Sequence, residues 1–123
     1  MLFRSHIDAE RLRQIRAADE ATDDALRDGD VSAYMESNFR FHSLIYGAAP
    51  MPLANRMIES LWMQFGPFMR VVYGRYGTAS MIDQHKAATK AIAGGDAEAL
   101  RDAIAGDIGD CHDLMRDWEK LNA

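Results

Sequence analysis

The sequence predicts an all-α protein, an antiparallel helical bundle of five to six helices formed by residues 1–123 as a single domain. Three observations lead to this prediction. Apolar residues recur at the spacing of one helix face between glycine and proline breaks, and no useful stretch alternates with a period of two. The chain has 123 residues, of which 48% are hydrophobic, so it is long enough to bury a core.

The first two helices are expected at residues 7–27 and 31–46. Gly29 suits the position after a helix end, where the backbone needs a positive φ, so it closes the first segment. Asp30 precedes the second segment and can accept a hydrogen bond from a backbone N–H of its first turn. The apolar stripe of the first segment is thin and consists of Leu12, Ile15, Ala18, Thr22 and Leu26.

The third helix is expected at residues 52–76 and is rich in Leu, Met, Trp and Phe. These apolar residues occupy much of its circumference, so part of this helix must be covered by something other than the rest of the chain. We therefore expect a homodimer. Pro67 predicts a kink inside this helix, because proline removes one backbone donor and clashes with the preceding turn.

The last two helices are expected at residues 80–93 and 96–121, separated by a pair of glycines. Ser80 can begin the former as the first residue of a capping box, and Asp96 can cap the latter. A glycine turn this short predicts that the two helices pack side by side as an antiparallel hairpin.

Four polar residues fall on the inner faces of three predicted helices. Asn38 and His42 lie one turn apart in the middle of an apolar face, and His85 lies at the centre of another. In an antiparallel hairpin, Asp107 lies roughly 4.5 Å from the level of His85 along the helix axis, whereas His112 lies roughly 12 Å away. The register therefore predicts that Asp107 joins His85 and that His112 does not.

These four residues have two interpretations. Two imidazoles and a carboxylate are a common ligand set for a divalent transition metal, and they favour zinc or nickel while the oxygen ligands keep manganese open. The same residues can also form a hydrogen-bonded polar network within the core, because buried polar groups must find partners.

Composition narrows the function classes. The net charge is −5 and no dense cluster of Lys and Arg is present, which argues against nucleic acid as a partner of this segment. The single cysteine, Cys111, excludes an intramolecular disulfide and suits a reducing compartment. We find no signal peptide and no apolar run long enough to span a membrane, so we expect a soluble cytoplasmic protein.

Two motifs resemble a known family. The first is Asn38-x-x-x-His42 followed by the SLIYGAA run at residues 43–49. The second lies within residues 83–99 and consists of a His, an Ala-Ile pair and a Gly-Asp turn before the last helix. Together they resemble the FCD domain, the C-terminal effector domain of FadR-type regulators in the GntR family of bacterial transcription regulators.

The resemblance implies a helical bundle that encloses one metal ion. The family's ligands are an Asp or Asn followed by three His, and the first three positions fall on Asn38, His42 and His85. The fourth falls on Asp107, which is a departure from the family pattern. The family's effectors are small organic acids whose carboxylate completes the metal shell, and its members form dimers.

A second departure is the absence of the family's winged helix-turn-helix domain from these residues. One early helix of the effector domain is also expected to be absent or shortened. The chain is then either a fragment of a regulator or a stand-alone effector domain, and in both cases we expect no operator binding by this segment alone.

Three function classes follow. The leading one is a ligand sensor that is not an enzyme, in which Arg70, Tyr34 and Tyr73 are candidate effector-binding residues. The second is a non-haem metal-dependent enzyme, because two His and one carboxylate with open positions also form the iron site of some oxygenases. The third is an interaction domain with a degenerate metal site.

Overall fold

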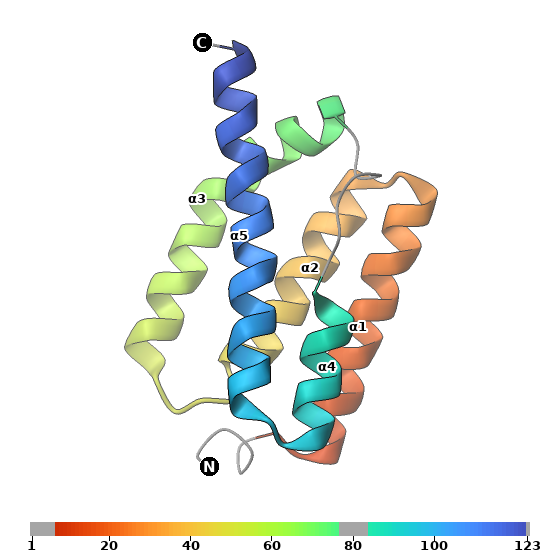
Figure 1. Ribbon diagram of the computed structural model, residues 1–123, viewed down its shortest axis with the longest axis vertical. Coiled ribbons are helices and arrows are strands. Elements are labelled where there is room, and N and C mark those ends of the chain that lie inside the picture. The colour runs from red at the N-terminus through yellow and green to blue at the C-terminus, as the bar shows by residue number, and fades with distance from the viewer. Residues whose placement is uncertain (1–6, 77–83, 123) are drawn as a thin grey trace.

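The computed structural model describes residues 7–76 and 84–122, which form five helices and no strand. This confirms the predicted all-α bundle. The helices are α1 (Ala9–Asp28), α2 (Val31–Tyr46), α3 (Pro52–Tyr76), α4 (His85–Gly94) and α5 (Ala97–Asn122). In Figure 1, α5 runs the length of the molecule between α3 on one side and the α1–α2 pair on the other.

The ends of the helices follow the predicted capping residues closely. Gly29 ends α1 with φ of 69°, a left-handed conformation that side chains with a Cβ rarely adopt. The Asp30 carboxylate accepts a hydrogen bond from the backbone N–H of Ala33 at 3.0 Å and so begins α2. The Asp96 carboxylate accepts one from Ala99 at 3.0 Å in the first turn of α5. These local signals explain why the observed bounds lie close to the predicted ones.

The start of α4 differs from the prediction. The helix begins at His85, after Gln84, which adopts φ −101° and ψ 15° and makes no side-chain cap. The predicted capping box at Ser80 lies outside the described residues. The helix is therefore shorter at its start than expected, and this places His85 in its first turn.

Helix α3 continues through Pro67, as predicted for a segment that a proline bends rather than ends. Figure 1 shows the last turns of α3 running in a different direction from its first turns. None of the described helices combines the length and the apolarity that crossing a membrane requires.

The main core lies between α1, α2, α4 and α5. Its buried members are three large aliphatic residues, one aromatic residue and four alanines: Ile15, Ala18, Phe41, Ile45, Ala88, Ala91, Leu100 and Ala103. A second cluster of Ala25, Tyr34, Met35 and Met69 joins α1, α2 and α3. Alanines on three of the helices keep the helix axes close, so the polar side chains beside the main core are also enclosed.

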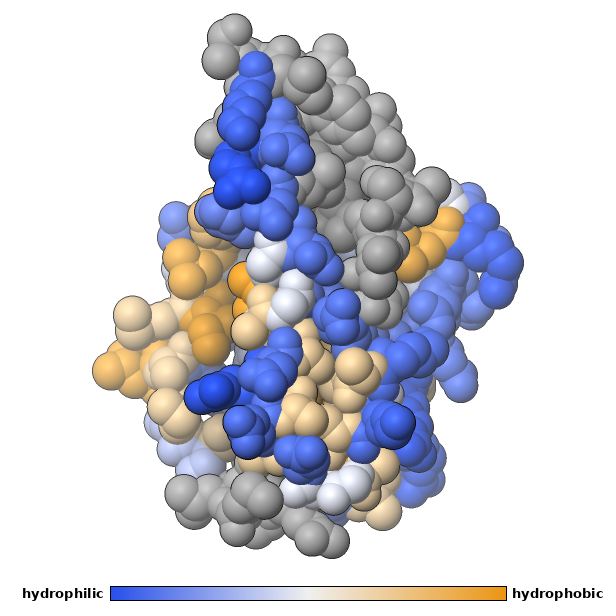
Figure 2. Space-filling model, viewed as in Figure 1, coloured by the Kyte–Doolittle hydropathy of each residue, from blue (hydrophilic) through white to orange (hydrophobic). Residues whose placement is uncertain are grey.

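Much of α3 remains uncovered. Large apolar side chains along this helix are exposed, and Figure 2 shows hydrophobic residues gathered on this side of the molecule. The exposed residues at its start and along its first turns are Met51, Leu53, Met57, Leu61, Met63 and Phe65. Large exposed apolar side chains gathered along one helix are typical of a surface that binds a partner, whereas single exposed apolar residues are normal on a monomer.

Candidate metal centre

Three side chains from three helices meet beside the main core. His42 comes from α2, His85 from the first turn of α4 and Asp107 from α5, and one ligand atom of each lies within 4.8 Å of the others. The distance from Asp107 Oδ2 is 2.7 Å to His42 Nε2 and 3.4 Å to His85 Nε2. The structure thus places Asp107 beside His85, as the helical register predicted.

Burial and aromatic packing hold the two imidazoles in place. His42 and His85 are each 1% exposed. The His85 ring stacks on Phe41 with 3.8 Å between ring centroids and an interplanar angle of 11°, and Trp62 packs against His42 with centroids 5.5 Å apart. These rings have little freedom to turn, so packing fixes the direction in which their nitrogen atoms point.

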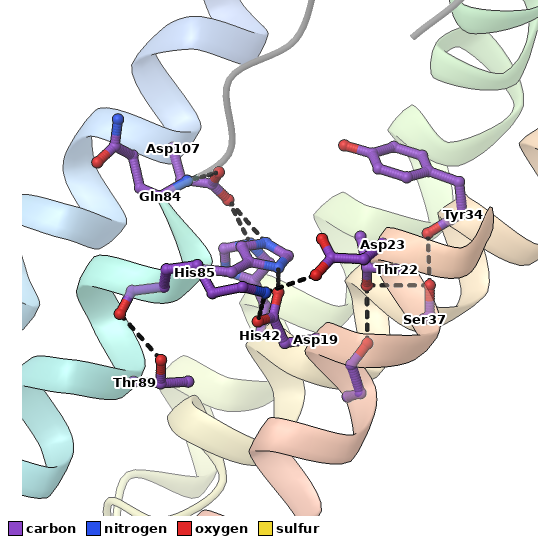
Figure 3. A network of polar contacts seen from close by, with 12 residues as sticks. Asp19, Thr22, Asp23, Tyr34, Ser37, His42, Gln84, His85, Thr89 and Asp107 are labelled. Atoms are coloured by element: carbon purple, nitrogen blue, oxygen red, sulfur yellow. Dashed lines mark hydrogen bonds and ion pairs between the residues drawn. The ribbon is translucent and has the colours of Figure 1, made fainter. Parts of the chain in front are cut away.

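Asp107 is oriented by a backbone group. The N–H of Gln84 donates to Asp107 Oδ1 at 3.2 Å, which leaves Oδ2 facing the two imidazoles. Gln84 directly precedes α4, so the same turn that presents His85 also aims the carboxylate of Asp107 (Figure 3).

The second nitrogen of each imidazole also has a partner. His42 Nδ1 lies 3.1 Å from the Tyr46 hydroxyl, and His85 Nδ1 lies 3.2 Å from Asp19 Oδ1. In both rings the contacts of Nδ1 leave Nε2 directed at Asp107, as in metal sites whose histidines are held by an outer hydrogen bond.

The charges of the site favour an anionic carboxylate. Burial opposes ionisation of Asp107, but the contacts of its carboxylate with the His42 and His85 imidazoles outweigh this effect and hold the pKa of Asp107 well below its usual range. Burial, with the nearby charge of Asp107, raises the pKa of Tyr46 to about 12, so this phenol stays protonated. The centre therefore holds one fixed negative charge.

The buried amide oxygen of Asn38 is a separate observation that bears on metal binding. It lies one turn before His42 on α2 and is 8% exposed, and its Oδ1 atom has no hydrogen-bond partner among the described residues. An unsatisfied buried carbonyl costs about 1–3 kcal/mol, and a cation is one way to satisfy it. The donor set of two imidazoles and one carboxylate fits a divalent transition metal.

Comparison with known proteins identifies the family. Residues 2–110 match the model of the FCD domain. This chain belongs to the FCD domain family. FCD domains are the C-terminal domains of GntR-family regulators, which agrees with the predicted resemblance and with the helical bundle. No curated protein and no solved structure matches the chain.

The other residues predicted for the site of this FCD domain lie elsewhere or cannot be placed. Tyr34 is buried in the second cluster, two turns before His42 on α2. The side chains of Arg70 and Tyr73 lie outside the described residues. His112 is exposed and contacts Asp113 at 3.8 Å, as expected for a surface residue. The effector-binding roles of Arg70, Tyr34 and Tyr73 stay predictions.

Two residues of the FCD domain site were missed from sequence. Asp19 follows Ile15 by one turn on the thin apolar stripe of α1, and a carboxylate in that position was a signal for a buried ionic partner. Tyr46 lies one turn after His42 on α2, at a spacing that brings side chains together. Neither residue type is unusual in a helix, so only their positions pointed to the site.

Acid should destabilise the FCD domain through Asp107 when a chelator keeps metal away. The folded pKa of Asp107 lies below the value of about 3.9 of an unfolded chain, so its ionised form stabilises the fold above that pH. This contribution is lost as the pH falls from about 4 toward the depressed pKa. We expect the melting temperatures of the wild type and Asp107→Asn to converge over this range, as measured by circular dichroism.

The exposed carboxylate of Asp102 provides the control, because its contact with the neighbouring Arg101 is long, at 4.0 Å, and its side chain is 70% exposed. Asp102→Asn should follow the wild-type pH profile. An Asp107→Asn profile parallel to that of the wild type would show that the carboxylate does not stabilise the fold.

Proposed function

We propose that this FCD domain is the effector-sensing domain of a GntR-family transcription regulator and that it senses a small organic acid through a bound divalent metal. The observation that carries the proposal is the convergence of His42 Nε2, His85 Nε2 and Asp107 Oδ2, three atoms that can each donate to a metal. The family supports sensing over catalysis, because FCD domains belong to transcription regulators.

The metal ion is zinc, nickel or manganese. His42, His85 and Asp107 would hold it, with Asn38 as a further oxygen ligand. Three protein ligands leave one position open on a tetrahedral ion, and four leave positions open on an octahedral ion. A metal in such a site would supply a Lewis acid that binds the carboxylate of an organic acid. The buried ring of Phe41 stacks on His85 and the half-buried ring of Trp62 packs against His42, so both rings reduce the contact of the imidazoles with water. A less polar surrounding strengthens the attraction between a metal and an anion.

An apolar groove near the centre could bind the part of the effector that does not contact the metal. The groove lies between α2 and α3, has a volume of about 390 Å³ and includes Phe39, Trp62 and Met63 in its lining. Trp62 packs against both Phe39 and His42, so this groove is separated from the imidazole by one side chain. Arg70, Tyr34 and Tyr73 remain the proposed polar contacts of the effector.

We also propose that the protein forms a homodimer in the cytoplasm through the exposed apolar side of α3. Leu61→Glu should shift a dimer toward monomer by about tenfold or more in dissociation constant, because it places a charge on an apolar interface. Gln14→Glu on the exposed side of α1 is the matched control. Sedimentation equilibrium measures both, and a wild type that stays monomeric at high micromolar concentration would contradict the proposal.

We expect no sequence-specific DNA binding by this segment alone, because its net charge is −5 and the phosphate backbone attracts positive charge. In the intact regulator, DNA binding belongs to a winged helix-turn-helix domain. A sequence-selective, salt-sensitive gel shift with this chain would contradict this expectation.

The test of the proposed function is metal content followed by ligand screening. Protein purified without a chelator and without a nickel column should contain about one divalent ion per chain, and a chelator should lower its melting temperature. Small carboxylic acids should then raise the melting temperature of the metal-loaded protein only. If the protein binds none of zinc, nickel and manganese, the proposal is wrong and the third function class, an interaction domain with a degenerate metal site, applies.

A further inference from the structure

A buried carboxylate on α1 reaches the centre from outside the ligand set. Asp19 is 4% exposed, and its Oδ1 atom lies 3.2 Å from Nδ1 of His85. Burial of an ion is costly unless it is paired and hydrogen-bonded, so the position of Asp19 calls for a specific function. Asp19 and His85 lie 66 positions apart in the sequence, so this contact links α1 to the start of α4.

The other carboxylate oxygen of Asp19 is held by a lysine. Lys86 follows His85 directly and donates from Nζ to Asp19 Oδ2, and the same Nζ lies 2.6 Å from Asp23 Oδ2. The two oxygens of Asp19 therefore have separate partners, one in the centre and one at the edge of the molecule. Figure 3 shows Asp19 and Asp23 on α1 facing the first turn of α4.

Asp19, the partner of His85, and Tyr46, the partner of His42, differ in whether they can donate a hydrogen bond. A neutral imidazole has one N–H, and a carboxylate that is ionised can only accept a hydrogen bond. Asp19 therefore requires the proton of His85 on Nδ1, which leaves the lone pair of Nε2 for another partner. The Tyr46 hydroxyl beside His42 can donate or accept, so it does not impose a tautomer in the same way.

We infer that Asp19 is a positioning residue that fixes His85 in the Nδ1–H tautomer and directs Nε2 at the metal, while Lys86 holds Asp19 in place. This inference rests on the proposed metal-binding function. Asp19 touches neither the metal nor the effector; it acts through His85. The metal affinity of this FCD domain then depends on α1 as well as on the three helices that supply the ligands.

The experiment compares two substitutions of Asp19 with a matched control. Asp19→Ala removes the acceptor, and Asp19→Asn keeps the shape of the side chain while it removes the charge. Zinc affinity, measured by competition with a chromophoric chelator, should fall about tenfold to a hundredfold for Asp19→Ala and less for Asp19→Asn. Asp23→Asn, which loses a contact to Lys86 but leaves the Asp19–His85 contact, should change the zinc affinity less than threefold.

The second readout reports the tautomer directly. In zinc-loaded, ¹⁵N-labelled wild type, NMR should show a proton on His85 Nδ1 that exchanges slowly with water. In zinc-loaded Asp19→Asn the same proton should exchange faster, and in Asp19→Ala it should do so even more. A residue that only braces α1 against α4 would lower thermal stability without changing this signal.

The outcomes separate this inference from the proposed function. If the wild type binds no zinc, nickel or manganese, both are wrong. If the wild type binds metal and both Asp19 variants bind it within threefold of the wild type, Asp19 is only a structural tie and the sensor function stands. Equal losses of affinity in Asp19→Asn and Asp23→Asn would also overturn the inference, because they would indicate general loosening of α1. If Asp19→Ala does not fold, Asp19→Asn decides the question.

Discussion

His42→Ala and His85→Ala should each abolish stoichiometric metal binding. Each substitution removes one of the three donor atoms that lie within 4.8 Å of one another, and we expect the incomplete ligand set to lose a divalent ion on dialysis. Elemental analysis of dialysed protein measures the loss. The same variants should lose the rise in melting temperature that the wild type shows when metal is added.

The size of this stability effect follows from linkage. A ligand that binds only the folded state stabilises it by about 4 kcal/mol when its free concentration is a thousand times its dissociation constant. The wild type with excess metal should therefore melt well above its chelated form, whereas each variant should melt at one temperature with or without metal.

His112→Ala is the matched control, because His112 is exposed and lies on the same helix as Asp107. It should retain both the metal and the melting shift. If His42→Ala and His85→Ala leave metal content and melting temperature unchanged, the cluster is a hydrogen-bonded core network. If His112→Ala alone loses the ion, surface binding accounts for the metal.

Prediction from sequence succeeded where local chemistry decides the structure. Asp30 and Asp96 hold backbone N–H groups of their own first turns, and Gly29 takes a positive φ, so each signal needs only its neighbours. The meeting of His85 and Asp107 was also predictable, because a two-glycine turn sets the register of the α4–α5 hairpin.

Prediction failed where contacts join helices that are distant in sequence. The link between Asp19 and His85 depends on how α1 packs against α4, and no repeat or spacing in the chain encodes that packing. The start of α4 was missed for a related reason. Gln84 leaves the helical conformation and donates its N–H to Asp107 on another helix, so a tertiary contact accompanies the start of α4 at His85.

Phe41→Ala should cost about 3–5 kcal/mol of folding free energy, a large part of the roughly 5–15 kcal/mol that stabilises a typical domain. Phe41 is 0% exposed, belongs to the main core and stacks on His85 at 3.8 Å. The truncation leaves a cavity and frees the imidazole of His85 to turn. Urea denaturation in the presence of a chelator measures the free energy of unfolding of the metal-free protein.

Two further variants separate packing from ring stacking. Phe41→Leu keeps most of the buried volume and should cost about 1.5 kcal/mol or less, yet it removes the flat face against which His85 rests. It should therefore weaken zinc binding while it preserves most of the stability.

Phe65→Ala on the exposed side of α3 is the control and should change the folding free energy by about 0.5 kcal/mol or less at concentrations that keep the protein monomeric. Equal costs for Phe41→Ala and Phe65→Ala would contradict the assignment of Phe41 to the core, and full zinc affinity in Phe41→Leu would show that the stacked ring does not orient His85.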